Sequence, residues 1–342
     1  MPESIRTHSR NIRFGAAFIL IAATILFAVF RTTEDPLIVY CAHDAMYAEA
    51  IVRAFAAETG IPVRVKFDTE ATKSLGLVEL IKKQRNAPLC DVFWNNELLG
   101  TMDLAAEGLL DSYKGTGYAR ISETFKDPEG RWTGFGARMR VYIVNTDNLP
   151  VADARAVDEY LEGDLARMAI ANPLYGTTLT HYSILWKELG GAGLKAQDAD
   201  WRRRGVKIVN GNASVKNLVA QGVCDLGWTD TDDAFLAITA GDPVKLLPVR
   251  VNGQAVCIPN TVSMIKGSSN PEAARRFIDY LLSEQCEIAL ANSASHQIPL
   301  GPVDDDQLPE TVRDLRQYVA QGYPLGDLGD ARAACLEWLN TN

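Results

Sequence analysis

Apolar and polar positions succeed one another along the chain in a rhythm that predicts strands and helices in turn. The continuous apolar run at 37–41 is typical of a buried parallel strand. Apolar residues then recur at helical spacing over 44–59, and Gly60 is placed to end that helix. The same alternation continues through strand 63–67, helix 74–84 and strand 91–94. This order predicts a doubly wound, mostly parallel sheet with right-handed crossovers.

A second unit of the same kind follows. An antiparallel stretch is predicted between the two units, with strands at 132–135 and 140–145. The further predicted strands are 168–171, 206–209, 225–228 and 262–265, and the further helices are 98–109, 180–189, 214–221 and 271–284. We therefore expect an α/β fold with two lobes, each a sheet with flanking helices.

Each predicted parallel strand ends in a polar segment. In open α/β sheets, ligands bind outside the carboxyl ends of the strands. Six such segments therefore predict a binding cleft between the two sheets. The candidate residues on the first five are His43, Asp44, Thr69, Glu70, Thr72, Asn95, Asn96, Glu97, Tyr175, Gly176, Thr177, Thr178 and Asn212.

The sixth segment, residues 229–233, is the most acidic. Its candidate ligand-binding residues are Asp230, Thr231, Asp232 and Asp233. Carboxylates brought this close are costly unless a positive or hydrogen-bonding group lies among them. The alternative is a solvated loop in which Asp232 or Asp233 caps the next helix. Taken alone, the segment fits either interpretation.

Composition and charge narrow the class of protein. The chain has 342 residues and a formal net charge of −9, which argues against nucleic acid as a partner. An apolar run at 14–30 follows Arg6, Arg10 and Arg13, and predicts an export signal that is either cleaved or retained as a single membrane anchor. The rest of the chain is then periplasmic. The six cysteines show no C-x-x-C spacing, so no zinc or redox motif is indicated.

The sequence carries no motif of a nucleophilic or metal-dependent enzyme, and we expect a binding protein. Two alternatives stay open at this stage. One is a ligand sensor for a membrane kinase. The other is a hydrolase that uses the carboxylates of Asp232 and Glu97.

The order of several motifs resembles that of a known family, the periplasmic substrate-binding proteins of ABC importers, in their ferric-ion-binding branch. The resemblance covers residues 37–310. The motifs that carry it are Val39-Tyr40, Glu58-Thr59-Gly60-Ile61-Pro62-Val63, Asp91-Val92-Phe93-Trp94, Ala106-Glu107-Gly108-Leu109-Leu110, Arg138-Met139-Arg140-Val141, Asn172-Pro173, Gly176-Thr177-Thr178 and Ala273-Ala274-Arg275-Arg276-Phe277.

The resemblance implies two lobes that are joined by two crossing strands and close on the ligand. Lobe 1 would hold 37–137 plus 262–300, and lobe 2 would hold 148–255. The crossings would lie near 138–147 and 248–262, with the C-terminal helices of 301–342 packed on lobe 2.

The resemblance also implies a ligand set. The family's metal ligands correspond to Asp44 (with His43 beside it), Glu97 or Asn96, and the pair Asp232 and Asp233, which stands where the family has two tyrosines. The anion-binding turn corresponds to Tyr175-Gly176-Thr177, and Asn212 is a further polar contact. Apart from the resemblance, Arg138 and Lys73 are candidate counter-charges, with a solvated surface position as the alternative.

The departure from the tyrosine pair matters for the cargo. Carboxylates are hard oxygen donors and are less selective for ferric iron than phenolates. The implied cargo is therefore a ferric or divalent ion held with a synergistic anion, or a small polar solute. The implied partners are an ABC permease and its ATPase, with the protein itself a monomer.

Overall fold

The computed structural model describes residues 35–68 and 75–341. The predicted export signal and anchor at 14–30 lie outside this range, as do the candidate residues Thr69, Glu70 and Thr72 and the counter-charge Lys73. Within the described part of the chain, no helix is long and apolar enough to cross a membrane.

Most predicted strands are present within a residue or two of their expected ends. The strands are β1 (Leu37–Cys41), β2 (Val63–Phe67), β3 (Val92–Asn95), β4 (Leu110–Asp111), β5 (Thr133–Asn145), β6 (Met168–Ala171), β7 (Lys207–Val209), β8 (Leu226–Asp230), β9 (Val244–Pro248), β10 (Arg250–Val251), β11 (Gln254–Ala255) and β12 (Cys257–Ile265).

Helices follow the strands as the apolar spacing predicts. They are α2 (Ala45–Thr59), α3 (Leu75–Lys83), α4 (Leu99–Ala106), α5 (Thr116–Arg120), α6 (Ala154–Leu161), α7 (Gly176–Arg203), α8 (Asn212–Ala220), α9 (Thr231–Ala240), α10 (Pro271–Leu281), α11 (Glu284–Ala291), α12 (Glu310–Val319) and α13 (Gly329–Asn340). Gly60 ends α2 in the left-handed conformation, with φ at 75°.

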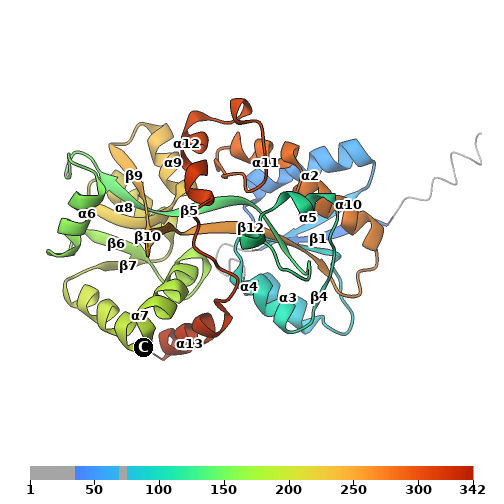
Figure 1. The fold of residues 1–342 in the computed structure, drawn as a ribbon, viewed down its shortest axis with the longest axis horizontal. Coiled ribbons are helices and arrows are strands. Elements are labelled where there is room, and N and C mark those ends of the chain that lie inside the picture. Colours follow the sequence, from blue (N-terminus) through green and yellow to red (C-terminus); the bar gives the residue numbers. More distant parts are fainter. Residues whose placement is uncertain (1–34, 69–74, 342) are drawn as a thin grey trace, which may run out of the picture. The chain divides into compact units, whose positions relative to one another are not determined.

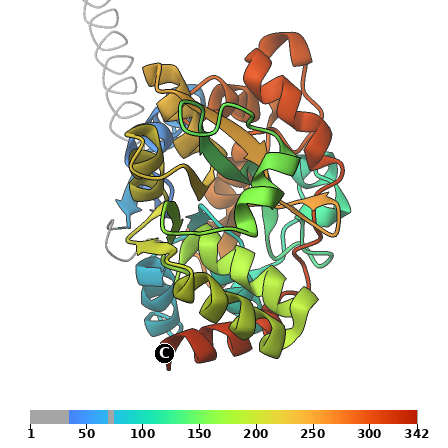
Figure 2. The same ribbon diagram turned by 90° about the vertical axis from the view of Figure 1, so that its left-hand side faces the viewer.

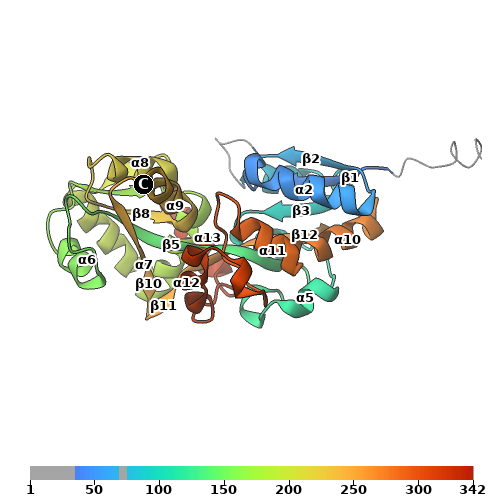
Figure 3. The same ribbon diagram turned by 90° about the horizontal axis from the view of Figure 1, so that it is seen from above.

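The strands form one path of order β2-β1-β3-β12-β5-β8-β6-β7. At one end β1 pairs in parallel with β2 and β3, and at the other β6 pairs in parallel with β7 and β8. Antiparallel β12 and β5 join the two parallel groups. Figure 1 shows α2 and β1 in one half and α8 and α9 in the other. Figure 3 shows β2, β1 and β3 near α2, and β8 near α8 and α9. The two sheet halves are the two lobes that the sequence predicts.

Strand β5 connects the halves and corrects one prediction. The separate strands expected at 132–135 and 140–145 are a single strand of 13 residues. Its first part pairs with β12, and its second part, from Arg140 onward, pairs with β8 and β9. Gly134 and Gly136 weaken the strand signal in the sequence. The strand continues through them because this part of β5 pairs with β12. Close packing requires glycine at position 134, since a Cβ there would lie 2.7 Å from the carbonyl oxygen of Phe125.

Helix α7 is longer than the expected 180–189, because it begins at Gly176 and continues past a kink at Gly190 (φ 71°) to Arg203. Gly-Thr-Thr is a poor helix start by propensity. Contacts to a neighbouring strand override that weakness, since the Thr177 hydroxyl donates to Asp230 at 2.6 Å.

The C-terminal helices pack in different places. Val312 and Leu315 of α12 join the apolar cluster of Phe55 and Phe277, whose rings meet edge to face at 4.9 Å. Helix α13 instead packs along α7. Figure 2 shows this red terminal helix beside the yellow-green α7. The exact lobe limits stay a prediction.

A substitution at Gly227 tests how tightly β8 packs against α8. A Cβ there would lie 2.4 Å from Cγ1 of Val215 and 3.1 Å from the carbonyl oxygen of Ala169. We expect Gly227→Ala to destabilise the fold by about 2 kcal/mol, because overpacking a tight core forces side chains off their rotamers. Gly329→Ala is the matched control, since nothing lies within 4 Å of the added Cβ. Urea unfolding measures both variants, and equal midpoints would show that β8 and α8 have room to separate.

Candidate functional site

A polar cavity of about 200 Å³ lies where the two sheet halves meet. Its walls come from both halves and from the polar ends of their strands. The lining residues are Asp44, Tyr47, Asn96, Arg138, Ala171, Asn172, Tyr175, Gly176, Thr177, Thr178, Asn210, Gly211, Asn212, Ala213, Asp230, Asp232, Asp233 and Leu236.

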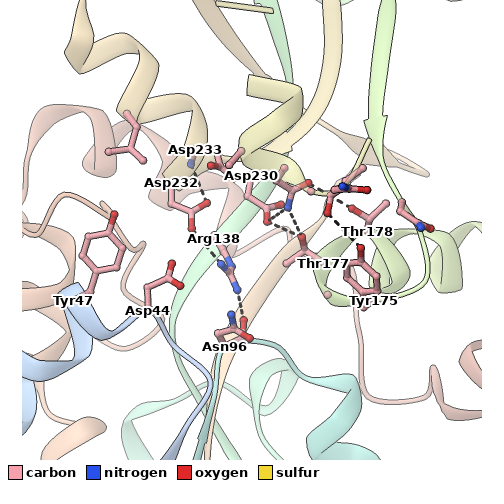
Figure 4. A pocket seen from close by; sticks show the side chains of 18 residues that line it. Asp44, Tyr47, Asn96, Arg138, Tyr175, Thr177, Thr178, Asp230, Asp232 and Asp233 are labelled. Carbon is pink, nitrogen blue, oxygen red and sulfur yellow. Dashed lines mark hydrogen bonds and ion pairs between the residues drawn. The ribbon is translucent and has the colours of Figure 1, made fainter. Parts of the chain in front are cut away.

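The first half contributes one helix start and one strand end. Asp44 is the N-cap residue of α2, and Tyr47 lies three residues further on, so both side chains are on the same face of the helix. Asn96 follows β3. Figure 4 shows Asp44 and Tyr47 on one side of Arg138 and the threonines of α7 on the other. Burial, and next the charge of Asp232, raise the pKa of the Tyr47 phenol.

The second half contributes three helix starts. Helices α7, α8 and α9 begin at Gly176, Asn212 and Thr231, and each start lies at the cavity or next to a residue that lines it. The residues at the N-cap positions of α7 and α8 make no side-chain cap hydrogen bond. The first backbone N–H groups of a helix are hydrogen-bond donors at the positive end of its dipole. This wall of the cavity therefore suits an anionic or hydroxyl group.

Strand β5 supplies the charged centre. Alternate residues of a strand point to the same face, and here Arg140 lies opposite Asp230 of β8. The Arg140 Nη1 atom donates to Oδ1 of Asp230 at 2.7 Å, and this pair is buried. One step along β5 towards the cavity, Nη1 of Arg138 donates to Oδ2 of Asp232 at 3.2 Å. The strand therefore presents two arginine–aspartate pairs in a row.

Around the inner pair, hydrogen bonds join three elements of the second half. Asp230 accepts from Thr177 at 2.6 Å and from Nδ2 of Asn212 at 2.8 Å. Nη1 of Arg140 also donates to Oδ1 of Asn212 at 3.1 Å. Among the described residues, Nε and Nη2 of Arg140 have no hydrogen-bond partner, so Asp230 is the main compensation for a fully buried charge.

A second buried polar residue lies behind the inner pair. His181 of α7 packs its ring on Trp228 with a centroid distance of 4.3 Å. Burial, and then the charge of Arg140, hold the pKa of His181 well below its ordinary value. The neutral ring therefore packs as part of the core.

The outer acidic side chains lie too close together, and too deeply buried, for all of them to ionise at ordinary pKa values. Burial raises the pKa of Asp232, although Arg138 lowers it. Burial also raises the pKa of Asp233, and Asp232 and Asp230 raise it further. Among the described residues that line the cavity, Arg138 is the only basic one. The cavity is therefore an acidic site.

Eleven of the predicted binding residues line this cavity. They are Asp44, Asn96, Arg138, Tyr175, Gly176, Thr177, Thr178, Asn212, Asp230, Asp232 and Asp233.

Four other predicted residues do not line it. His43 stacks on Trp94 at a centroid distance of 5.5 Å. The buried amide of Asn95 donates to Glu97 and Thr101 at 3.2 Å in each case. Thr231 accepts a hydrogen bond from the backbone N–H of Met139 at 3.1 Å. These residues, with Glu97, are part of the framework that holds the cavity.

The expected metal set of Asp44, Glu97, Asp232 and Asp233 is not assembled. Glu97 turns away and accepts from the backbone N–H groups of Leu99 and Gly100 at the start of α4, at 2.6 and 2.8 Å. In the described part of the chain, no group of three or more His, Cys, Asp or Glu residues is placed to hold a metal ion. No local signal around Glu97 predicts that a helix start engages its side chain.

The structure also decides the role of the acidic segment. The N-cap residue of α9 is Asp230, and neither Asp232 nor Asp233, which lie in its first turn. Asp230 makes no side-chain cap hydrogen bond, and Thr229, Asp230 and Thr231 are buried. The expectation of a solvated loop capped by Asp232 or Asp233 is therefore wrong, although acidic residues in a first turn favour a helix start through the dipole. The same turn lines the cavity.

Sequence reasoning missed several residues of the site. Tyr47 is recognisable only by its spacing of three from Asp44 on a helix. Arg140 is recognisable as a second arginine at an alternate position of an apolar strand. Leu236 lies one turn beyond Asp232 on α9, and Asn172 and Asn210 belong to segments that were predicted as polar loops.

Comparison with known proteins places the chain among binding proteins. The family model described as bacterial extracellular solute-binding protein matches residues 37–293. An uncharacterized protein of Haemophilus influenzae is 23% identical over 339 residues, which cover 91% of this chain and 93% of that protein.

Solved structures share the fold at low identity. Iron-bound HitA from Pseudomonas aeruginosa is 22% identical with a TM-score of 0.73, covering 89% of this chain and 99% of its own. The ferric binding protein from Campylobacter jejuni is 16% identical with a TM-score of 0.77, covering 89% and 98%. AfuA from Actinobacillus pleuropneumoniae, solved with fructose-6-phosphate bound, is 17% identical with a TM-score of 0.71, covering 90% and 98%. These likenesses establish the two-lobed fold.

Removing the charge of Asp230 tests the inner pair. We expect Asp230→Asn to lower the free energy of unfolding by about 3–5 kcal/mol, because it leaves Arg140 as an uncompensated buried charge. Glu159→Gln is the control: it breaks an exposed pair with Arg155 and should cost less than about 0.5 kcal/mol. Denaturant unfolding followed by circular dichroism measures both. A loss at position 230 as small as that of the control would contradict the dependence on this pair.

The pH dependence of stability tests the crowding of the outer carboxylates. The pKa of Asp233 is raised in the folded state, so the native protein keeps a proton that the unfolded chain releases. The free energy of unfolding therefore falls as pH rises above about 4, the pKa of the carboxyl group in the unfolded chain. We expect Asp233→Asn to gain stability over the parent progressively between about pH 5 and about pH 8. The exposed Asp314→Asn variant should show no such trend in thermal unfolding. A constant difference between Asp233→Asn and the parent would refute the effect.

Proposed function

We propose that this chain, which belongs to the bacterial extracellular solute-binding proteins, captures a small polar solute with a positively charged group and delivers it to an ABC permease. The solute binds in the cavity between the two lobes. The protein works as a monomer outside the cytoplasmic membrane, and its partners are the importer's permease and ATPase at that membrane.

The observation that carries the proposal is the charge of the cavity. Asp44 comes from one lobe, and Asp232 and Asp233 come from the other, while Arg138 is the only basic lining residue among those described. Buried carboxylates are costly unless a positive charge or hydrogen-bond donors compensate them. A cationic group placed among these side chains supplies that compensation, and it contacts both lobes at once.

The arrangement supports an organic cation better than a metal ion. The fourth expected ligand, Glu97, is engaged by the start of α4, and Asp232 already pairs with Arg138. The opposite wall is lined by the amide and hydroxyl side chains of Asn172, Tyr175, Thr177, Thr178, Asn210 and Asn212. Asp230 and Arg140 hold those of Thr177 and Asn212 in place. Such groups fix the orientation of a polar organic molecule.

The cavity volume limits the size of the solute. About 200 Å³ is below the roughly 300–1,000 Å³ of drug-sized ligand sites. The uncapped first turns of α7 and α8 suit an anionic or hydroxyl group at the other end of the same molecule. In this two-lobed fold, HitA was solved with iron and AfuA with fructose-6-phosphate, so the fold is compatible with an organic solute as well as with iron.

A thermal-shift screen tests the proposal. The probes are putrescine, ethanolamine and glucosamine as amines, Mn²⁺ and ferric citrate as metals, and phosphate and glucose as anionic and neutral controls. We expect at least one amine to raise the melting temperature by about 4 °C at 100 times its Kd, because that excess adds about 2.7 kcal/mol. Stabilisation by the metals, by phosphate or by glucose without any by an amine would overturn the proposal.

Substitution in the cavity ties the shift to this site. Asp232→Asn removes one carboxylate of the cavity and should abolish most of the shift given by the amine. Asp314→Asn removes one exposed carboxylate from α12 and should leave the shift unchanged. Equal shifts in the two variants would place amine binding elsewhere on the protein.

A further inference from the structure

Arg138 lies at the junction of the two lobes. It belongs to the part of β5 that pairs with β12, where Ile258 is its partner. One nitrogen of its guanidinium donates to Asp232 of the second lobe at 3.2 Å, and the other donates to the backbone carbonyl of Asn96 in the first lobe. Figure 4 shows the guanidinium between these two residues. One positive side chain therefore links both walls of the cavity.

The two arginines of β5 differ in what surrounds them. Arg140 is fully buried, and its contacts are to Asp230, Thr177 and Asn212 within the second lobe. Arg138 lines the cavity and keeps 11% of its side chain exposed. Arg140 is therefore part of the framework, whereas the contacts of Arg138 face the space in which a solute binds.

Arg138 also supplies the positive charge that compensates the acidic wall when no solute is bound. Burial alone lowers the pKa of Arg138, but the nearby carboxylates, first of all Asp232, raise it above its ordinary value. The guanidinium stays charged under all physiological conditions. A solute cation that approaches Asp232 therefore meets a position that a cation already occupies.

We propose that Arg138 is a specificity-determining residue: an internal cation that competes with the solute's positive group for Asp232. This inference rests on the proposed function and adds the feature that selects among cationic solutes. A weakly charged or badly placed cation gains too little from Asp232 to offset the loss of the Arg138 contacts. A cation that reaches Asp232 together with Asp44 and Asp233 gains more, and it binds.

The test compares two substitutions at position 138. Arg138→Gln removes the charge and keeps a donor for the carbonyl of Asn96, whereas Arg138→Lys keeps the charge. Titration calorimetry with putrescine at fixed ionic strength should show about tenfold tighter binding by Arg138→Gln, the factor that 1.4 kcal/mol gives. Arg138→Lys should stay within about threefold of the parent, because the competing charge remains. Arg155→Gln, which alters an exposed arginine of α6, is the control and should match the parent.

The outcomes separate this inference from the proposed function. Tighter binding by Arg138→Gln supports the competition, even where the parent itself binds putrescine too weakly to measure. Unchanged or weaker putrescine binding by a folded Arg138→Gln overturns the competition and leaves amine capture intact. Should the parent bind phosphate in place of amines, and Arg138→Gln lose it, both proposals fail and Arg138 is an anion-binding residue.

A second measurement tests the competition if Arg138→Gln does not fold. In that case the nitrogen-15 signal of the Arg138 side chain in the parent, assigned with Arg138→Lys, reports the same competition. Saturating putrescine should shift that signal and speed the exchange of the guanidinium N–H protons with water, because the guanidinium leaves Asp232. A signal that putrescine leaves unmoved would overturn the competition.

Discussion

The buried ion pair between Arg140 and Asp230 is the interaction on which the rest of the site depends. It holds β5 against β8 by side chains as well as by backbone pairing. It also engages the hydroxyl of Thr177 and the amide of Asn212, and it thereby positions the starts of α7 and α8. A buried pair of this kind adds little net stability compared with apolar residues of the same shape. Its value here is that it positions the end of β8 and the starts of α7 and α8, which form one wall of the cavity.

From that pair outward, compensation of charge becomes less complete. Asp230 has one guanidinium and two further donors. Asp232 has Arg138, which it shares with a backbone carbonyl, and Asp233 has mainly like charges as neighbours. Proteins tolerate such local strain at functional sites and offset it elsewhere in the fold. Charge compensation therefore decreases from the core to the cavity. Under the proposed function, the carboxylates that gain most from a bound cation are those that a solute can reach.

The sequence predicts the framework of this protein better than its contacts. Apolar runs and glycine positions predict most strands and the α2 helix to within a residue or two, because burial of one face and left-handed turns leave direct signals. They fail where tertiary contacts override local preference. Gly134 breaks the strand signal of β5, yet pairing with β12 continues the strand through it. Helix α7 starts four residues early because Thr177 is held by Asp230.

The same contrast between a predictable framework and unpredictable contacts applies to the site. The polar ends of strands identify the cavity wall, since the topology of a parallel sheet brings them together. The direction of each side chain is decided by partners far away in the chain. Glu97 points to the start of α4, and His43 lies against Trp94, and neither choice is visible in the local sequence. Arg140 looks like any strand residue until Asp230, 90 positions later, is placed opposite it.

The spacing of the two arginines on β5 has an evolutionary consequence. Because positions 138 and 140 are separated by one residue and share a face, substitution at the outer pair leaves the inner pair in place. Under the proposed function, a change of cargo requires exchange of residues that carry little of the fold, such as 138 and 232, while the scaffold stays constant. Divergence within such a scaffold proceeds by independent steps, since each new cargo does not need a new way of folding. On one strand, β5, a residue that holds the fold (Arg140) and a residue open to exchange (Arg138) thus lie two positions apart.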